Sequence, residues 1–299
     1  MEISHQFVDV GSVKIHYLIA GQGDRTIVLL HGGGLDTAEL SWELFIPELA
    51  DNFRVIALDW PGYGLSDKPD VKFTIAYYVD LFDNFLNALN VLKASLVGIS
   101  MGGAIAIGYS LEHPEVVEDL VLVDSYGLQR KVPTQFLSYL YVRTPGVRRL
   151  TYWLLKQRAF IKYSMSSILK RPGSVTEDLV DQIHQQVMIP GVAKAFSDLQ
   201  DNDVTWNGLK TVFLDKLPQI RANTLIIHGE KDTLVPLECS REAHRLIPGS
   251  SLNVMEGCGH WPQRDNPAEF NQIVGAFLRH ESEKIVQPIK TRKSTNKNW

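Results

Sequence analysis

One serine, Ser100, has a glycine two residues away on each side in the segment GISMG, residues 98–102, at the end of an apolar run. The segment fits the pattern G-x-S-x-G between an expected strand and an expected helix. A sharp turn there requires small flanking residues and lifts the serine oxygen above a sheet. Because a serine hydroxyl is a poor nucleophile until a neighbouring base takes its proton, the chain must also supply a base and an orienting carboxylate.

Two later segments supply these partners at the same expected edge of the sheet. His260, in GCGHWPQRDNP, follows the last expected strand, and Asp232, in HGEKDTLVP, follows the strand before it. In the chain these residues occur in the order Ser100, Asp232, His260. This matches a known order of triad residues, in which the nucleophile comes first, then the acid and then the base. We therefore expect these three residues to form a catalytic triad. Asp124, which also ends an expected strand, stays open as an alternative acid.

The segment HGGGLD, residues 31–36, follows another expected strand. Its glycines let backbone N–H groups approach a ligand closely, and a carbonyl under attack needs such donors for its developing negative charge. We expect the N–H groups of Gly33 and Met101 to form an oxyanion hole, with Gly32 and Gly34 in the substrate pocket. A phosphate-binding loop is disfavoured, because neither the G-K-[ST] ending nor the G-x-G-x-x-G spacing is present.

Short apolar runs recur along the chain with helical stretches between them: TIVLLH, FRVIALD, ASLVGIS, DLVLVD, NTLIIHG and SLNVME. Such runs are typical of strands that are buried on both faces of a parallel sheet. The first two segments, HQFVDV and VKIHYLIA, alternate more and flank a Gly-Ser turn, which predicts an antiparallel hairpin at the sheet edge. We expect an α/β fold with a mostly parallel central sheet and helices on both faces.

The alternation of strands and helices stops after Asp124 and resumes near Ala222. The segment between them has helical patterns and aromatic residues but no run like the core strands. We therefore expect a core of residues 1–124 and 216–283, with a helical cap, residues 125–215, inserted between two strands of one sheet. The basic, polar residues 284–299 are expected to form a disordered tail.

The first part of this cap is unusually basic. Residues 125–171 contain ten Lys and Arg residues and no Asp or Glu. They also contain the aromatic residues Tyr126, Phe136, Tyr139, Tyr141, Tyr152, Trp153, Phe160 and Tyr163. We favour a cap whose aromatic side chains face the pocket and whose cations face water. Weak contact with an anionic lipid surface and attraction of an acidic substrate stay open. A nucleic-acid partner is disfavoured, because no recognised binding motif accompanies the charge.

The composition, 44% hydrophobic and 21% charged over 299 residues, suits a chain with one large core. The first residues show no secretory signal, so we expect a cytoplasmic location. Residues 94–111 are uncharged, but the glycines and serines in this segment favour a buried strand and helix over a membrane span.

The spacing of the cysteines and histidines predicts neither a disulfide framework nor a metal site. Cys239 and Cys258 are expected to be free thiols. His31 and His228 each end a strand and precede a glycine, so we expect them to be structural. The expected chemistry requires no metal and no cofactor.

From His31 to His280 the chain resembles the α/β-hydrolase superfamily. The resemblance rests on the motifs LLHGGG, LDWPGYGLSDKP, GISMGGAIA, IIHGEKDTLVP and GCGHWPQRDNP. Within the superfamily, HGGG, SMGG and GHWPQ are most similar to the meta-cleavage-product hydrolases, which cleave a carbon–carbon bond in dienoate products of aromatic ring opening. The resemblance implies the α/β-hydrolase fold and a Ser-His-Asp triad.

Two positions depart from that branch. Its members usually carry an asparagine before the nucleophile and an arginine on a cap helix, and both serve the acidic end of the substrate. Ile99 and Ile183 stand at these positions here, and we expect them to line the pocket together with Trp261. Losing a charged clamp for a carboxylate is not a conservative change.

These departures favour a serine hydrolase that cleaves carboxylic esters of fairly apolar substrates through an acyl-enzyme. Carbon–carbon bond hydrolysis of the meta-cleavage type is the alternative. A ligand-binding receptor on the same fold is an alternative of another class, because receptors with an intact triad exist on this fold.

Overall fold

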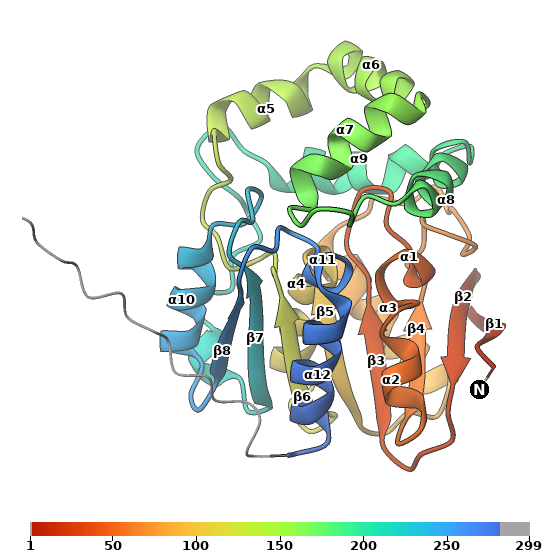
Figure 1. The fold of residues 1–299 in the computed structure, drawn as a ribbon, viewed down its shortest axis with the longest axis vertical. Coiled ribbons are helices and arrows are strands. Elements are labelled where there is room, and N and C mark those ends of the chain that lie inside the picture. Colours follow the sequence, from red (N-terminus) through yellow and green to blue (C-terminus); the bar gives the residue numbers. More distant parts are fainter. Residues whose placement is uncertain (1, 282–299) are drawn as a thin grey trace, which may run out of the picture.

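The structure is a computed structural model that describes residues 2–281, and its central sheet is covered by helices on both faces (Figure 1). Within these residues the sheet has eight strands, in the order β1-β2-β4-β3-β5-β6-β7-β8. The strands are β1 (Ser4–Val10), β2 (Val13–Ala20), β3 (Thr26–Leu30), β4 (Arg54–Leu58), β5 (Ala94–Ile99), β6 (Val117–Val123), β7 (Asn223–Gly229) and β8 (Ser251–Met255). Strand β2 is antiparallel to β1 and β4, and the other neighbours are parallel. The expected sheet and its edge hairpin are confirmed.

Helices cover the two faces of this sheet. On one face lie α3 (Ile75–Ala88), α4 (Met101–Glu112) and α10 (Leu237–Leu246), and on the other lie α1 (Ala38–Trp42), α2 (Ile46–Ala50), α11 (Pro262–Asp265) and α12 (Pro267–Leu278). Successive side chains of a strand point to opposite faces. Leu96 of β5 accordingly packs in the cluster of α3 and α4, while Val97 and Ile99 pack in the cluster of α2 and α12.

A layer of helices between β6 and β7 covers one edge of the sheet, at the top of Figure 1. It consists of α5 (Gln135–Arg143), α6 (Pro145–Leu155), α7 (Arg158–Ile168), α8 (Glu177–Val187) and α9 (Val192–Asp203), and the short 3₁₀ helix η1 (Leu217–Gln219) leads back to β7. The inserted helical cap is thus present. The boundaries at 124/125 and 215/216 stay predictions, and the expected tail, residues 284–299, lies outside the described residues.

Helix α9 is one part of the cap that packs closely on the core. A Cβ atom added at Gly33 would lie 2.7 Å from the Phe196 ring, and one added at Gly62 would lie 2.5 Å from Ala195. At the end of α9, the Tyr126 hydroxyl donates a hydrogen bond to the Asp203 carboxylate. Glycines in the core loops therefore let α9 pack directly over the residues around Ser100.

In the described part of the chain, no helix is long and apolar enough to cross a bilayer. The uncharged residues 94–111 divide between β5 and α4, on either side of the turn at Ser100. Cys239 and Cys258 are free thiols, as expected.

Candidate active site

Ser100 lies on the sharp turn between β5 and α4, with backbone angles φ 50° and ψ −116°. Its N–H donates to the carbonyl oxygen of Val123 at 3.0 Å, and its own carbonyl accepts from Tyr126 N–H at 3.0 Å. A Cβ atom at Gly102 would lie only 2.2 Å from the Leu30 carbonyl oxygen. The glycines thus permit the turn, and two backbone hydrogen bonds hold Ser100 in a left-handed conformation that costs free energy.

His260 and Asp232 are joined by a hydrogen bond of 2.7 Å between Nδ1 and Oδ2. The other oxygen of Asp232 accepts the N–H groups of Leu234 and Val235, at 2.7 and 3.2 Å. Burial would raise the pKa of Asp232, but the bonds from His260 and the backbone lower it below its usual value. Asp232 is therefore an ionised carboxylate that orients the imidazole.

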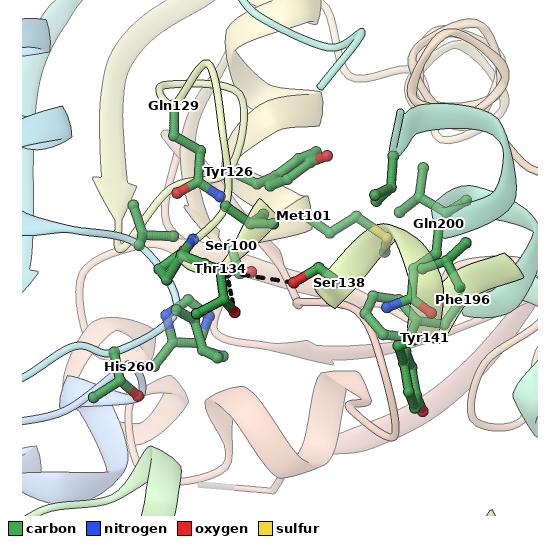
Figure 2. Close-up of a pocket in the computed structure, with 18 of the residues that line it drawn as sticks. Ser100, Met101, Tyr126, Gln129, Thr134, Ser138, Tyr141, Phe196, Gln200 and His260 are labelled. Atoms are coloured by element: carbon green, nitrogen blue, oxygen red, sulfur yellow. Dashed lines mark hydrogen bonds between the residues drawn. The ribbon is translucent and has the colours of Figure 1, made fainter. Parts of the chain in front are cut away.

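Ser100 and His260 line the same cavity (Figure 2). No hydrogen bond joins their side chains in residues 2–281. Such contacts are often long without substrate and tighten in the reacting complex.

The loop that carries His260 is fastened to the cap. His260 N–H donates to the Ile168 carbonyl oxygen at 2.9 Å, at the end of α7. The Asp265 carboxylate accepts the N–H groups of Gly259, Lys170 and Arg171 at 2.7 to 3.0 Å. Asp265 was not among the residues expected at the site. The structure shows that Asp265 holds the histidine loop against the cap.

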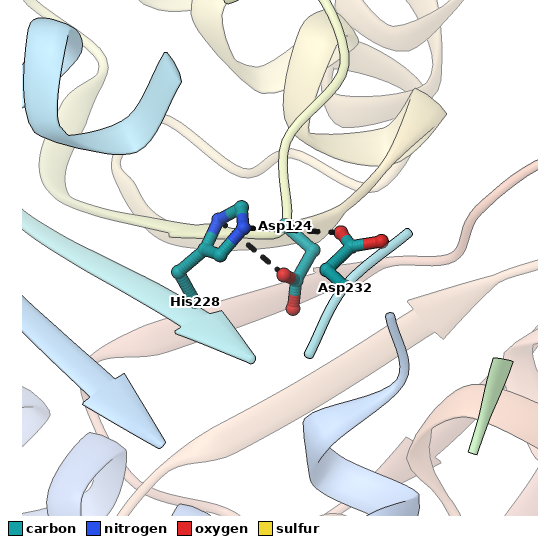
Figure 3. Close-up of side chains that lie close together, drawn as sticks. All are labelled: Asp124, His228 and Asp232. Carbon is teal, nitrogen blue, oxygen red and sulfur yellow. Dashed lines mark ion pairs between the residues drawn. The ribbon is translucent and has the colours of Figure 1, made fainter. Parts of the chain in front are cut away.

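Asp124, the alternative acid, lies beside Asp232 (Figure 3). Within residues 2–281 the carboxylate bonded to His260 is that of Asp232, not Asp124. Asp124 is fully buried, and one oxygen accepts Gly229 N–H at 3.0 Å while the other has no hydrogen-bond partner within residues 2–281. Burial, together with the charge of Asp232, raises the pKa of Asp124 well above its usual value. The contact with the imidazole therefore favours Asp232 as the acid.

His228 completes this cluster as a neutral, structural histidine. Its Nδ1 lies 2.8 Å from Ser240 Oγ and its Nε2 lies 3.1 Å from the Val235 carbonyl oxygen. Burial lowers the pKa of His228 to about 4. Asp124, His228 and Asp232 bring ligand-type atoms within 4.8 Å of one another. Both nitrogens of His228 are already engaged, however, so the cluster does not offer the donor set of a metal site.

The glycine loop lies directly against Ser100. A Cβ atom at Gly32 would lie 3.5 Å from Ser100 Cβ, and one at Gly33 would lie 3.7 Å from Met101 Sδ. Among the hydrogen bonds of the described residues, the N–H groups of Gly33 and Met101 have no acceptor. Both donors are therefore free for a ligand.

Buried polar groups hold this loop in place. Gly32 N–H donates to Asp36 Oδ2 at 2.7 Å, and the same oxygen accepts the Ser41 hydroxyl at 2.7 Å. The Trp261 indole N–H donates to Ser41 Oγ at 3.2 Å. On the other side, the His31 ring lies between the Gly32 carbonyl oxygen and Trp60 N–H, at 2.7 and 3.0 Å. His31 is thus structural, as expected.

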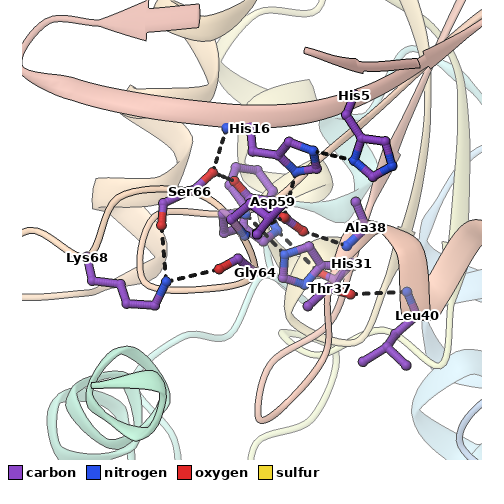
Figure 4. A network of polar contacts seen from close by, with 12 residues as sticks. His5, His16, His31, Thr37, Ala38, Leu40, Asp59, Gly64, Ser66 and Lys68 are labelled. Atoms are coloured by element: carbon purple, nitrogen blue, oxygen red, sulfur yellow. Dashed lines mark hydrogen bonds and ion pairs between the residues drawn. The ribbon is translucent and has the colours of Figure 1, made fainter. Parts of the chain in front are cut away.

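A second network of polar contacts lies next to the glycine loop and is centred on Asp59, which follows β4 (Figure 4). One oxygen of Asp59 accepts Ala38 N–H at 2.8 Å, at the start of α1. The other accepts Leu65 N–H at 2.9 Å and lies 2.8 Å from His16 Nδ1. Burial would raise the pKa of Asp59, but these bonds lower it. The Asp59 carboxylate therefore joins β2, α1 and the turn after β4.

The cavity above Ser100 has a volume of about 550 Å³. Figure 2 shows Tyr126 and Gln129 on one side of it and Phe196 and Gln200 on the other. The lining also includes Val132, Pro133, Thr134, Leu137, Ser138, Tyr141, Val142, Leu199, Val204, Thr233, Leu234 and Val235. In the described chain no Lys, Arg, Asp or Glu side chain lines this cavity. The pocket is therefore mainly apolar and carries no fixed charge from the basic cap.

The cap aromatics divide between the pocket and the surface. Tyr126 and Tyr141 line the cavity, whereas Phe136, Trp153 and Tyr163 are exposed. The expectation that the cap aromatics face the pocket thus holds for only some of them.

Five residues expected in the pocket do not line this cavity: Gly32, Gly34, Ile99, Ile183 and Trp261. The side chains of Ile99, Ile183 and Trp261 are buried in the hydrophobic cluster on the other face of the sheet. Ile99 lies there because side chains alternate along a strand. Trp261 points to Ser41, and the two glycines shape the loop. A direct contact of these residues with substrate stays a prediction.

Gln129 is a pocket residue that was not expected from the sequence. Its side chain is almost fully buried, at 3% exposure, and its amide oxygen has no partner in residues 2–281. It follows β6 by only a few residues, so its position after a core strand was the available signal.

The turn at Ser100 and the histidine–aspartate pair at the same sheet edge are those of hydrolases with an α/β fold. Residues 27–273 match the family model described as "Alpha/beta hydrolase family", and the chain belongs to that family.

Several relatives with named activities are similar to this chain. The chain is 32% identical over 285 residues to 2-hydroxy-6-oxo-6-(2'-aminophenyl)hexa-2,4-dienoic acid hydrolase of Metapseudomonas resinovorans, covering 93% of this chain and 92% of that protein. It is 32% identical over 286 residues to 2-hydroxymuconate semialdehyde hydrolase of Pseudomonas sp. strain CF600, with coverage of 93% and 94%. A solved meta-cleavage product hydrolase from Pseudomonas fluorescens IP01 matches with a TM-score of 0.79, 28% identity and coverage of 93% and 98%. The resemblance to the meta-cleavage branch is confirmed.

Proposed function

We propose that Ser100 is the nucleophile, His260 the general base and Asp232 the orienting acid of a serine hydrolase. The observation that carries this proposal is the 2.7 Å bond between His260 and Asp232 at the cavity that Ser100 also lines. The N–H groups of Gly33 and Met101, which have no other acceptor in the described residues, form the oxyanion hole.

The reaction then follows from this arrangement. Ser100 Oγ attacks a carbonyl carbon of the substrate while His260 takes its proton, and the carbonyl oxygen becomes an oxyanion held by the two N–H groups. When the intermediate collapses, His260 returns the proton to the leaving atom and the acyl group stays on Ser100. Water, deprotonated by His260, attacks the acyl-enzyme, and a carboxylic acid is released as Ser100 recovers its proton.

For the bond that is cleaved, we propose a carbon–carbon bond next to a ketone. The relatives with 32% identity are named as hydrolases of a dienoic acid and a muconate semialdehyde. These names support the carbon–carbon alternative better than the ester that we expected from the sequence.

Gln129 supplies the polar contact for such a substrate. An unpaired buried amide costs free energy, so a substrate group that bonds to it is favoured. Because the terminal amide carries a carbonyl oxygen and an NH₂ group and can rotate, Gln129 can present either a donor or an acceptor to the cavity. Since no Lys or Arg of residues 2–281 lines the cavity, this amide is the group that we expect to meet the acidic end of a dienoate.

Ester hydrolysis remains a second candidate, favoured by one observation. In the described chain no Lys or Arg lines the cavity, and a carboxylate buried there would lose hydration with little compensation. A cytoplasmic location stays a prediction from the sequence.

The deciding experiment compares a ring-fission dienoate with aryl esters of graded chain length as substrates of the unmodified protein. We expect the dienoate to have the highest kcat/KM and Ser100→Ala to remove turnover of every substrate. Faster turnover of the esters would reassign the enzyme as an esterase. Labelling of Ser100 without multiple turnover of any substrate would support a receptor instead.

A further inference from the structure

Two helices of the cap, α5 and α6, present large apolar side chains to solvent. Helix α6 has no buried residue, and α5 buries only Val142. Figure 1 shows both helices at the end of the molecule farthest from the lower edge of the sheet. Their exposed apolar residues are Phe136, Leu137, Leu140, Val147, Leu150 and Trp153, each between 44% and 64% exposed. We call these six residues the outer cap face.

One apolar side of α6 points away from the protein. Val147, Leu150 and Trp153 recur at three-residue spacing on the exposed side of the helix. Arg148, by contrast, turns inward and bonds to the carboxylate of Asp201 at 3.0 Å. A surface helix of a globular protein ordinarily buries its apolar stripe and exposes its charges. Leu155 of α6 packs inward against a core cluster, so the stripe of Val147, Leu150 and Trp153 is an additional apolar side left in solvent. Such a stripe indicates a face that meets an apolar phase.

Cations flank this apolar face. Lys131, Arg149 and Lys156 are exposed, and their side chains have no ion-pair or hydrogen-bond partner within residues 2–281. Residues 125–171 contain no Asp or Glu that could neutralise them. An apolar stripe bordered by free Lys and Arg is the pattern of helices that lie in the interface of an anionic membrane.

We propose that the outer cap face docks on a lipid surface that carries anionic headgroups. Apolar side chains enter the boundary between headgroups and acyl chains, and the flanking cations contact lipid phosphates. This contact is peripheral, since in the described chain no helix is long enough to span a bilayer.

The cavity lies next to the docking face, which bears on how substrate enters. This step rests on the proposed function. Leu137 belongs to the outer cap face and also lines the cavity, and Leu234, which is 45% exposed, lines the cavity as well. The rim of the pocket is thus apolar and continuous with the docking face. A docked protein would take apolar substrates directly from the lipid phase.

The test measures binding of the full chain to vesicles by co-sedimentation, using phosphatidylcholine vesicles with or without phosphatidylglycerol. We expect binding to the mixed vesicles, with little binding to phosphatidylcholine alone and a loss of binding at high salt. The protein carries Ser100→Ala throughout, so that binding is measured independently of catalysis and the proposed function can fail separately.

Three variants locate the surface. The double change Leu150→Glu and Trp153→Glu should abolish sedimentation, whereas Leu92→Glu should not alter it, because Leu92 is 83% exposed but lies outside the cap. Arg149→Gln and Lys156→Gln should each weaken binding about fivefold, and only to the anionic vesicles. Circular dichroism melting checks that each variant is folded.

The proposal is overturned if the unmodified face does not bind anionic vesicles, or if the double glutamate variant binds as well as its parent. A protein that does not sediment with vesicles but forms dimers that the double variant breaks would show that the face meets a second copy instead.

Discussion

Asp124 and Asp232 bring carboxyl oxygens within 4.8 Å of each other at the ends of neighbouring strands, yet only Asp232 is hydrogen-bonded to His260. Two carboxyl groups this close do not both ionise readily. The pKa of Asp124 is raised by burial and by the charge of Asp232, while the pKa of Asp232 is lowered by its bonds. The negative charge therefore resides on the carboxyl group that faces the imidazole.

This division of charge predicts unequal effects of two matched substitutions. Asp232→Asn should lower kcat by about 10⁴-fold, because the amide neither fixes the required tautomer of His260 nor stabilises its charged form. Asp124→Asn should have a far smaller effect, because Asp124 is already neutral. Steady-state kinetics on both variants decides between the two acids, and a larger loss for Asp124→Asn would reverse the assignment.

The raised pKa of Asp124 also predicts a pH dependence of stability. Below its usual pKa of 3.8 the carboxyl group is neutral in both the folded and the unfolded chain. As the pH rises from there to the raised pKa of the folded state, only the unfolded chain releases the proton, so this group contributes a loss of folding stability. An asparagine side chain at this position would not titrate and would not contribute this loss.

The gain in melting temperature from Asp124→Asn, relative to the parent, should therefore increase between acidic and neutral pH. Thermal unfolding followed by circular dichroism over this range measures it. A difference that does not change with pH would mean that Asp124 is ionised in the folded protein.

The proposed nucleophile can be tested without knowing the substrate. A fluorophosphonate probe should label the protein once, because it reacts with an activated serine. Ser100→Ala should abolish the labelling while the melting temperature stays close to that of the parent. Labelling of the folded Ser100→Ala protein at another serine would exclude Ser100 as the nucleophile.

Gln129 should affect substrate binding more than the chemical step. Gln129→Leu removes the unpaired amide but keeps an uncharged side chain, so KM for the dienoate should rise about tenfold with a small change in kcat. Gln219→Leu, an exposed substitution outside the cavity, serves as the control. An unchanged KM would show that the substrate does not reach this amide.

Ile183→Arg should destabilise the protein and leave the dienoate activity without gain. Ile183 is 1% exposed and packs in an apolar cluster instead of lining the cavity. An arginine there would bury an unpaired charge at a cost of about 3 kcal/mol or more. Urea unfolding measures this cost. An increase in dienoate turnover with unchanged stability would show that the side chain at position 183 reaches the substrate.

The elements whose residue pattern is local in the sequence could be predicted from it. The turn around Ser100 needs glycines that can be read directly from the chain, and Asp232 and His260 each follow a strand of the same sheet. The hairpin of β1 and β2 followed from alternation and a Gly-Ser turn.

The pocket was less predictable, because its lining depends on how the cap helices pack on the core. Phe196 reaches the cavity only because Gly33 lets α9 come close. Ile99 adjoins the proposed nucleophile in sequence, but the strand period turns its side chain to the other face. Neighbouring positions in sequence therefore say little about which side chains share a cavity.

The bonds from Asp265 and Ile168 to the histidine loop restrict how the roof over the pocket can open. They join the end of α7 and the residues after it to the loop of the imidazole, through the N–H groups of Gly259 and His260 and the Asp265 carboxylate. If the end of α7 moved away from the core, the loop of His260 would move with it, and His260 would lose its position next to the proposed nucleophile Ser100. The residues after α7 are thus tied to the loop of His260, whereas α5 and α6 are bonded to α9 and to the residues that follow it. A shift of α5 and α6 would therefore leave the bonds to the histidine loop intact.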